Sequence, residues 1–152
     1  MASTAQDPAP SDDTSALIDA LGQSAFLTMG AMTKIAAEHD LSLTQLRVLA
    51  ILRDRRLRMT DLAAYLGLEK STLSGLVARA ETRGLVGRAA DRSDKRAVEV
   101  FLTEDGQLLG KRIAAELADQ LAPVVSALRP AERRSLQELL AKALDATVQF
   151  EG

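Results

Sequence analysis

The chain has 152 residues, 47% of them hydrophobic, which is enough for one compact domain with a modest core and too few for two independent domains. It contains no Cys and one His, so disulfides, thiol redox chemistry and thiolate metal sites are excluded. Only carboxylates could still hold a cation, and we expect neither a metal nor a cofactor. The sequence also has no Gly-rich phosphate loop and no nucleophile with a matched base, so we expect no enzyme.

The net charge of −2 is unevenly distributed along the chain. Residues 53–96 hold eleven Lys and Arg against six Asp and Glu, whereas the remaining residues hold eight against fifteen. A basic segment on an acidic body suits a protein that presents one face to phosphates. The alternative is an ordinary solvated run of charges.

The N-terminal part is expected to be a disordered arm followed by a long helix. Residues 1–14 are small, polar and Pro-containing. From Ser15 to about Glu38, apolar residues recur at three- and four-residue steps and form one stripe. Gly22 and Gly30 each lower helix stability by about 1 kcal/mol relative to Ala in a helix interior. Their presence indicates close packing against another helix, either of the same chain or of a second subunit. The acidic start is unlike a signal peptide, and no run approaches the roughly 18 apolar residues of a membrane span, so we expect a cytoplasmic protein without membrane contact.

A capping box predicts a helix from Leu43 to about Leu52. The Ser42 side chain can accept from a backbone N–H while Gln45 reaches back to the start of the helix. A basic loop, 53–56, follows this helix. The inward positions of the helix are expected to be apolar and comprise Leu46, Val48, Leu49 and Ala50.

A short strand and a short helix come next. Leu57 to Met59 are expected to form the strand. Thr60 to Leu66 form the helix, because the Thr60 hydroxyl can cap and the Asp61 carboxylate meets the positive helix end. Gly67 supplies the turn that follows.

The periodicity predicts a further helix from Lys70 to Arg83, which Gly84 ends in a left-handed conformation. Leu73, Leu76, Val77 and Ala80 form its inward face. A major groove admits one α-helix, which contacts bases through the exposed face of its N-terminal half. Arg79 can pair with a guanine or bind a phosphate, and both interpretations stay open. The candidate DNA-contacting residues of this helix are Lys70, Ser71, Thr72, Ser74 and Arg79, with solvent-facing helix residues as the alternative.

Two strands, Leu85 to Ala89 and Ala97 to Leu102, are predicted to form a hairpin around a polar turn. That turn offers three cations, Arg92, Lys95 and Arg96, and a narrow minor groove attracts cations inserted at such a tip. We expect Asp94 to orient Arg96 by a charge-assisted pair. A mobile charged turn is the alternative interpretation.

Two helices are expected after the hairpin. Thr103 opens the first, whose apolar residues Leu109, Ile113, Leu117 and Leu121 repeat every four positions. Pro123 should kink or end it, because proline lacks the N–H and its ring clashes with an earlier carbonyl. Pro130 opens the last helix, whose apolar side comprises Leu136, Leu139, Leu140, Ala143 and Leu144.

In order and spacing these features resemble the MarR family of bacterial transcription regulators over about Leu41 to Leu128. The resemblance implies a mainly α fold with a small β-hairpin wing, in which a winged helix-turn-helix is joined to a helical dimerisation domain. The segments that carry it are Leu43 to Leu49, Leu62-Ala63 with Leu66-Gly67-Leu68, Ser71 to Ser74, Arg83 to Val86, Asp91 to Arg96 and Leu102 to Gly106. The implied division is a disordered arm (1–14), a dimerisation helix (15–40), a DNA-binding winged lobe (41–102) and C-terminal dimerisation helices (103–152).

The resemblance also implies a function: a homodimer that binds double-stranded DNA at a palindromic operator, acts as a repressor and responds to a small aromatic or phenolic effector. The effector would occupy a cleft between the helical domain and the winged lobe, near Met29, Met32 and His39. A Met stripe at helical spacing is more often part of a core than of a ligand site, and a residue such as His39 is more often a helix-end surface residue than a ligand contact. The absence of Cys argues against the peroxide-sensing branch, which needs a thiolate.

Several positions depart from the usual family pattern. Glu69 stands where Ser is the usual cap, Gly75 where many members carry a larger polar or basic residue, and Arg92 where Pro is common. Gly75 and the acidic body keep a second hypothesis open, a winged-helix dimer that acts as a protein-interaction adaptor or antirepressor. An adaptor should tolerate the loss of Arg79, Lys95 and Arg96, whereas a DNA reader should not.

Overall fold

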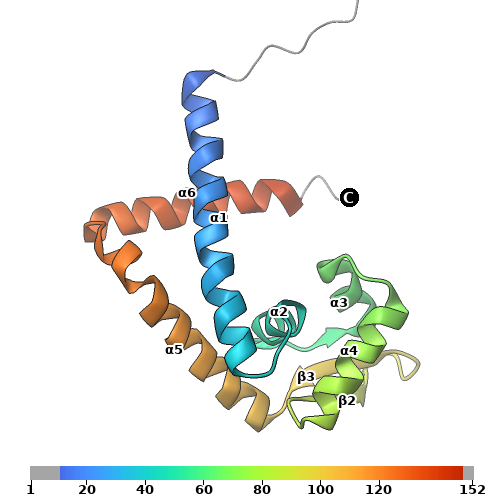
Figure 1. Ribbon diagram of the computed structural model, residues 1–152. Coiled ribbons are helices and arrows are strands. Elements are labelled where there is room, and N and C mark those ends of the chain that lie inside the picture. Colours follow the sequence, from blue (N-terminus) through green and yellow to red (C-terminus); the bar gives the residue numbers. More distant parts are fainter. Residues whose placement is uncertain (1–10, 149–152) are drawn as a thin grey trace, which may run out of the picture.

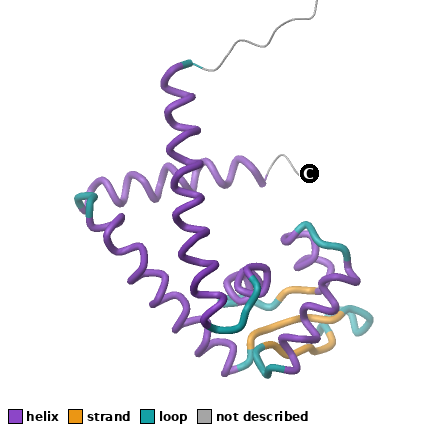
Figure 2. The backbone as a smooth tube through the Cα atoms, viewed as in Figure 1, coloured by secondary structure: helices purple, strands orange, loops and turns teal. Residues whose placement is uncertain are grey.

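The computed structural model describes residues 11–148 (Figure 1). It is mainly helical with one three-stranded antiparallel sheet, which confirms the predicted fold class (Figure 2). The elements are α1 (Asp12–Glu38), α2 (Leu43–Leu52), β1 (Leu57–Arg58), α3 (Met59–Leu66), α4 (Lys70–Thr82), β2 (Val86–Ala90), β3 (Val98–Leu102), α5 (Glu104–Ser126) and α6 (Pro130–Val148). The sheet and the short helices α2, α3 and α4 form a lobe, from which the long helices α1 and α5 extend (Figure 1).

Helix α1 begins earlier than predicted, so the expected disordered arm is wrong for residues 12–14. Two carboxylates, Asp12 and Asp13, lie in the first turn, where the positive end of the helix dipole favours them. The hydroxyls of Ser11 and Thr14 are also hydrogen-bonded at 2.9 Å across this turn. Residues 1–10 of the predicted arm lie outside the described residues.

Helix α2 has the predicted capping box. The Ser42 hydroxyl accepts from the Gln45 backbone N–H at 3.1 Å, and the Gln45 side chain accepts from the Ser42 N–H at 2.8 Å. Ala50 is exposed and was wrongly assigned to the inward face. The buried stripe continues at Leu52 instead, because a step of about 100° per residue places Val48, Leu49 and Leu52 within about 100° of one another and position 50 about 100° or more from each of them.

The start of α3 also differs from the prediction. Met59 is the first helical residue, and the N-cap is Arg58, which makes no side-chain cap bond. Thr60 therefore lies inside the helix and does not cap it. The strand fixes this boundary, because Leu57 and Arg58 pair with β3 and the chain turns directly after them. Gly67 ends the helix in the left-handed conformation at a φ of 62°, as predicted.

The three strands lie in the order β1-β3-β2, with Val86 opposite Leu102 and Leu57 opposite Val100. Each hairpin strand begins one residue later than predicted because the preceding residue belongs to a turn. The Leu85 N–H donates to the Ala80 carbonyl at the end of α4, and the Ala97 N–H to the Asp94 carbonyl in the wing turn.

The core of the lobe joins the inward face of α4 to β3, α2 and the end of α1. All four predicted inward positions of α4 are buried, and Leu73, Val77 and Val100 are fully so. Ile35 and Ala36, near the end of α1, belong to the same cluster at 1% exposure. The lobe and the last turns of α1 therefore share one core.

Helix α5 begins at the predicted Thr103 cap, whose hydroxyl accepts from the Gly106 N–H at 3.1 Å. It continues through Pro123 to Ser126, so the proline does not end the helix. A proline keeps a helical φ, and α5 continues past Pro123 without the one backbone bond that the missing N–H would make. Helix α6 begins at Pro130 as predicted. Among residues 11–148 no helix combines the length and the apolar character needed to cross a membrane.

Candidate nucleic-acid interface

Helix α4 is called the reading helix below, because the sequence predicts that it contacts DNA, and it presents short polar side chains on its outer face. Ser71, Thr72 and Ser74 are exposed, whereas Leu73 between them is completely buried. The N-cap is Glu69, whose side chain makes no cap bond. No side-chain cap therefore occupies the first N–H groups of the helix, at the end of the helix that carries the hydroxyls.

Arg79 extends along the reading helix toward its N-terminus. A Cβ added to Gly75 would lie 3.7 Å from the Arg79 Nη1, so the guanidinium covers the position where Gly75 has no side chain. Helical side chains lean toward the N-terminus, and the missing side chain leaves this path open. The glycine thus places the cation one turn closer to Ser74 than the Arg79 backbone is.

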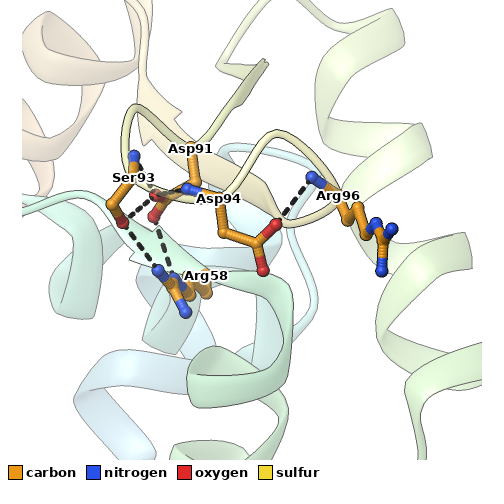
Figure 3. A network of polar contacts seen from close by, with 5 residues as sticks. All are labelled: Arg58, Asp91, Ser93, Asp94 and Arg96. Carbon is orange, nitrogen blue, oxygen red and sulfur yellow. Dashed lines mark hydrogen bonds and ion pairs between the residues drawn. The ribbon is translucent and has the colours of Figure 1, made fainter.

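A buried carboxylate organises the wing turn. Asp91 is 7% exposed, and its Oδ1 accepts from the backbone N–H of Ser93 at 2.7 Å and of Asp94 at 2.9 Å. The Ser93 hydroxyl donates to the same oxygen. Figure 3 shows how these bonds fold the turn around one side chain. These bonds hold the backbone of the turn, which carries the cations at the tip, in one conformation.

Arg58, the last residue of the edge strand β1, also binds this turn. Its Nε donates to Asp91 Oδ2 at 2.9 Å, and its Nη2 donates to the Ser93 hydroxyl at 3.1 Å (Figure 3). The Arg58 guanidinium, followed by the bonds from Ser93 and Asp94, lowers the pKa of the Asp91 carboxyl well below its usual range. Asp91 is therefore ionised at neutral pH. Arg58, Asp91, Ser93 and Asp94 are called the wing network below.

The expectation that Asp94 pairs with the Arg96 side chain is wrong. The Asp94 carboxylate accepts from the backbone N–H of Arg96 at 3.0 Å. The guanidinium points away from that carboxylate (Figure 3), and no ion pair involves it among residues 11–148. A turn that closes through backbone bonds leaves the cation free to face the reading helix.

A groove of about 440 Å³ separates the reading helix from the wing. It brings predicted residues of both elements together, since Lys70, Ser71 and Ser74 line one side and Arg96 the other. Arg88 and Arg58 also line it, but Glu81 and Asp91 respectively neutralise their charges. Its lining comprises Arg58, Met59, Thr60, Lys70, Ser71, Ser74, Arg88, Arg96, Ala97 and Val98.

The other predicted DNA-contacting residues lie outside the lining of this groove. Arg92 and Lys95 are exposed in the wing turn, and Thr72 and Arg79 are exposed on the reading helix. Sequence reasoning missed Arg58 and Asp91. The turn composition could have indicated Asp91, because Asp side chains commonly bond to the backbone two residues on. For Arg58 there was no local signal, since its partner is 33 residues away.

The three residues suggested for an effector lie in different surroundings. Met29 is 48% exposed on α1, and Met32 packs partly buried against the core of the lobe. His39 follows the end of α1, and its Nε2 lies 2.8 Å from the Glu116 Oε2 on α5. The structure thus gives His39 a role in joining two helices.

The fold and this groove define a winged helix-turn-helix protein of the kind found in transcription regulators. A model of the MarR family matches residues 39–97. The HTH-type transcriptional regulator TtmR of Methylorubrum extorquens (strain PA1) is 32% identical over 116 residues, which cover 76% of this chain and 58% of TtmR. The uncharacterized HTH-type transcriptional regulator YfiV of Bacillus subtilis (strain 168) is 30% identical over 110 residues, which cover 70% of this chain and 69% of YfiV. The chain belongs to the MarR family of transcription regulators.

The fold match extends over almost the whole described chain. The crystal structure of NadR in complex with 4-hydroxyphenylacetate superposes with a TM-score of 0.72 at 25% identity, and the match covers 91% of this chain and 95% of NadR. The fold that this chain shares with NadR therefore includes the helices outside the lobe. The chain spans little more than half the length of TtmR, since 58% of TtmR is covered.

Proposed function

We propose that this protein is a sequence-specific DNA-binding regulator that acts as a homodimer on a palindromic operator. The observation that carries the proposal is the groove in which the hydroxyls of Ser71 and Ser74 face Arg96 across a space open to solvent. Such a helix fits the major groove, while the adjacent wing reaches the phosphates and the minor groove.

The charges favour DNA over a protein partner at this surface. Arg92, Lys95 and Arg96 stand within five residues at the wing turn, and Lys70 begins the reading helix. Among residues 11–148 none of the four takes part in an ion pair. Cations without internal partners are available to displace counterions from phosphates, and this release supplies a large share of the affinity of a protein for DNA.

The proposed dimer rests on apolar residues that the single chain leaves exposed. In α1 these include Leu17 at 60% and Ile18 at 56% exposure, and in α6 Leu139 and Leu144 at 64% each. A second copy would cover them in an isologous interface, as the stripe on each helix suggests. Two reading helices related by a twofold axis would contact half-sites about 34 Å apart, one turn of DNA.

The proposed effector is a small aromatic or phenolic acid whose binding releases the DNA, and we propose that the DNA-bound protein acts as a repressor. The support is indirect: NadR, which has the same fold, was solved with 4-hydroxyphenylacetate. Met29 and Met32 lie on α1 close to where it enters the lobe. A ligand there could change the separation of the two lobes. Titration of 4-hydroxyphenylacetate and related phenolic acids into the protein–DNA complex tests this part.

The DNA-binding proposal is tested by removing cations from the wing. Lys95→Ala and Arg96→Ala should each weaken operator binding by about tenfold, whereas Arg134→Ala, an exposed control on α6, should not. The measurement is fluorescence anisotropy with a labelled operator. Unchanged binding by both wing variants would favour an adaptor that works through protein partners.

A further inference from the structure

We infer that Arg83 is a positioning residue that fixes the orientation of the reading helix relative to α1, and thereby the operator spacing that the protein accepts. The inference rests on the proposed function. Arg83 is the C-cap of the reading helix, at the end opposite to the DNA-contacting hydroxyls. Its side chain reaches the corner between α1 and α2, residues 39–42, which is far away in sequence.

The contact is a fork onto two consecutive carbonyls. Arg83 Nη1 donates to the Asp40 carbonyl at 2.8 Å, and Nη2 donates to the His39 carbonyl at 2.9 Å. A planar guanidinium makes two such bonds only in one orientation, so the pair is directional. The corner itself is held in an uncommon shape, since Asp40 has a φ of 55°, which few residues other than glycine adopt.

A cation at this position stabilises the C-terminal end of helix α1. The last carbonyls of any helix lack partners in the helix and carry partial negative charge. The last turn of α1 contains no basic residue, and Glu38 adds a carboxylate there. Arg83 supplies the missing positive charge from the reading helix. The two helix ends are therefore joined by a favourable electrostatic contact as well as by hydrogen bonds.

The apolar core alone does not provide the same constraint. Ile35 and Ala36 anchor the end of α1 in the lobe, but apolar contacts are not directional and permit small rotations of packed helices. On the opposite side of the corner, His39 bonds to Glu116 of α5 at 2.8 Å. The corner is thus bonded to α5 through a side chain and to the reading helix through its carbonyls.

The geometry of the reading helix amplifies any loss of this contact. The helix has 13 residues and is about 20 Å long. A tilt of about 10° about its Arg83 end would move its N-terminal end by about 3 Å, close to the rise of one base pair. A dimer in which both lobes can tilt would accept half-sites that are one base pair closer or further apart.

The test uses Arg83→Lys, which keeps the charge but cannot make the fork, and Arg83→Ala. Arg47→Lys is the matched control, because Arg47 also donates to a carbonyl, that of Tyr65 at 3.3 Å, but within the lobe. Each protein is titrated against the selected inverted repeat and against versions with one base pair removed from or added to the spacer. Arg83 is exposed, so we expect thermal stability to change by no more than about 2 °C.

We expect wild type and Arg47→Lys to favour the selected spacing by about tenfold, and both Arg83 variants to reduce that preference to about threefold or less. Equal weakening on all spacers would make Arg83 a phosphate contact and would overturn the inference. Failure of the wild type to bind any inverted repeat would instead refute the proposed function.

A second measurement addresses the inference without DNA. The natural chain has no Cys, so Gln23→Cys and Thr72→Cys place two spin labels at exposed sites of α1 and the reading helix. Dilution with excess unlabelled protein restricts the measured distances to one chain. Arg83→Lys should broaden the distance distribution, and Arg47→Lys should leave it unchanged. An identical distribution in wild type and both Arg83 variants would overturn the inference.

Discussion

The wing depends on a single ionised carboxylate. Asp91 receives two backbone N–H groups, one hydroxyl and the Arg58 guanidinium, so each of its oxygens is occupied. In sequence, Arg92 lies between Asp91 and Ser93, and Lys95 directly follows Asp94. At the scale of single residues, the position of the cations proposed to contact DNA is set by groups to which we assign no DNA contact.

Asp91→Asn should destabilise the protein in a pH-dependent way. Folding lowers the pKa of Asp91, so its stabilising effect is fully present above its unfolded pKa of about 3.9 and is lost as the pH falls toward its folded value. The difference in Tm between wild type and variant should be largest at pH 7 and should narrow below about pH 4. Thermal unfolding between pH 3 and 7 measures it, with Asp94→Asn as the control. A difference that stays constant over this range would contradict the assigned role.

Arg79→Ala distinguishes the two interpretations left open for this residue. If the guanidinium contacts a guanine, the variant should lose about 1 to 3 kcal/mol of binding free energy on the operator and should lose discrimination at one base position. If it binds a phosphate, affinity should fall equally on all sequences. Anisotropy titrations against operators with single base changes separate the two. Because Arg79 lies over Gly75, Gly75→Gln should crowd the guanidinium and weaken the same contact.

At the scale of elements, the sequence predicted the features that depend on residues close to one another in the chain. The inward face of the reading helix follows from its periodicity alone, and Leu73, Leu76, Val77 and Ala80 are all buried. The capping box at Ser42 involves residues three apart and was equally predictable. Element boundaries were less accurate by one to three residues, because the turns at Leu85 and Ala97 depend on bonds that a propensity does not encode.

Contacts between distant segments were not predictable from one sequence. Arg58 and Asp91 are 33 residues apart, and Arg83 is 44 residues from His39. Before the strands are paired and the lobe is folded, nothing distinguishes these two arginines from other exposed ones. At Asp94 the prediction failed for a contact between neighbours in sequence. It assigned an ion pair with the Arg96 side chain, whereas the carboxylate accepts from the Arg96 backbone N–H.

The junction of the reading helix with α5 gives a direct test of packing. A Cβ at Gly106 would lie 2.0 Å from the Leu85 carbonyl oxygen, a backbone atom that cannot move alone. Gly106→Ala should therefore destabilise the protein by about 1 to 3 kcal/mol. Gly110→Ala is the control on the same helix, because no atom lies within 4 Å of its added Cβ, and it should be neutral or stabilising by up to about 1 kcal/mol. Equal Tm values for the two variants would show that the close approach is absent.

At the scale of the whole molecule, the described chain has a buried core in the lobe and much exposed apolar surface on its long helices. Leu139 is 64% exposed, although it belongs to the apolar side predicted for α6. Single exposed leucines are common, but a continued stripe on α1 and α6 indicates an interface. The division of the chain into a DNA-contacting lobe and dimerisation helices stays a prediction until its assembly is measured.

Leu139→Glu should convert the proposed dimer into a monomer, because a buried carboxylate without a partner is strongly unfavourable. Glu138→Gln, on the opposite side of α6, should leave the assembly unchanged. Sedimentation velocity at micromolar concentration reports the molecular mass of each protein. A wild-type protein that sediments as a monomer of 16.3 kDa would contradict the proposed dimer.

Recognition of a DNA sequence by a dimer of this protein is tested most directly by selection from random duplexes. The purified wild-type chain would be used to enrich bound duplexes, whose affinity is then measured by anisotropy at several salt concentrations. We predict enrichment of an inverted repeat with half-sites about one turn apart, and an affinity that falls steeply with salt because each neutralised phosphate releases counterions. Weak binding without any enriched sequence would contradict the account.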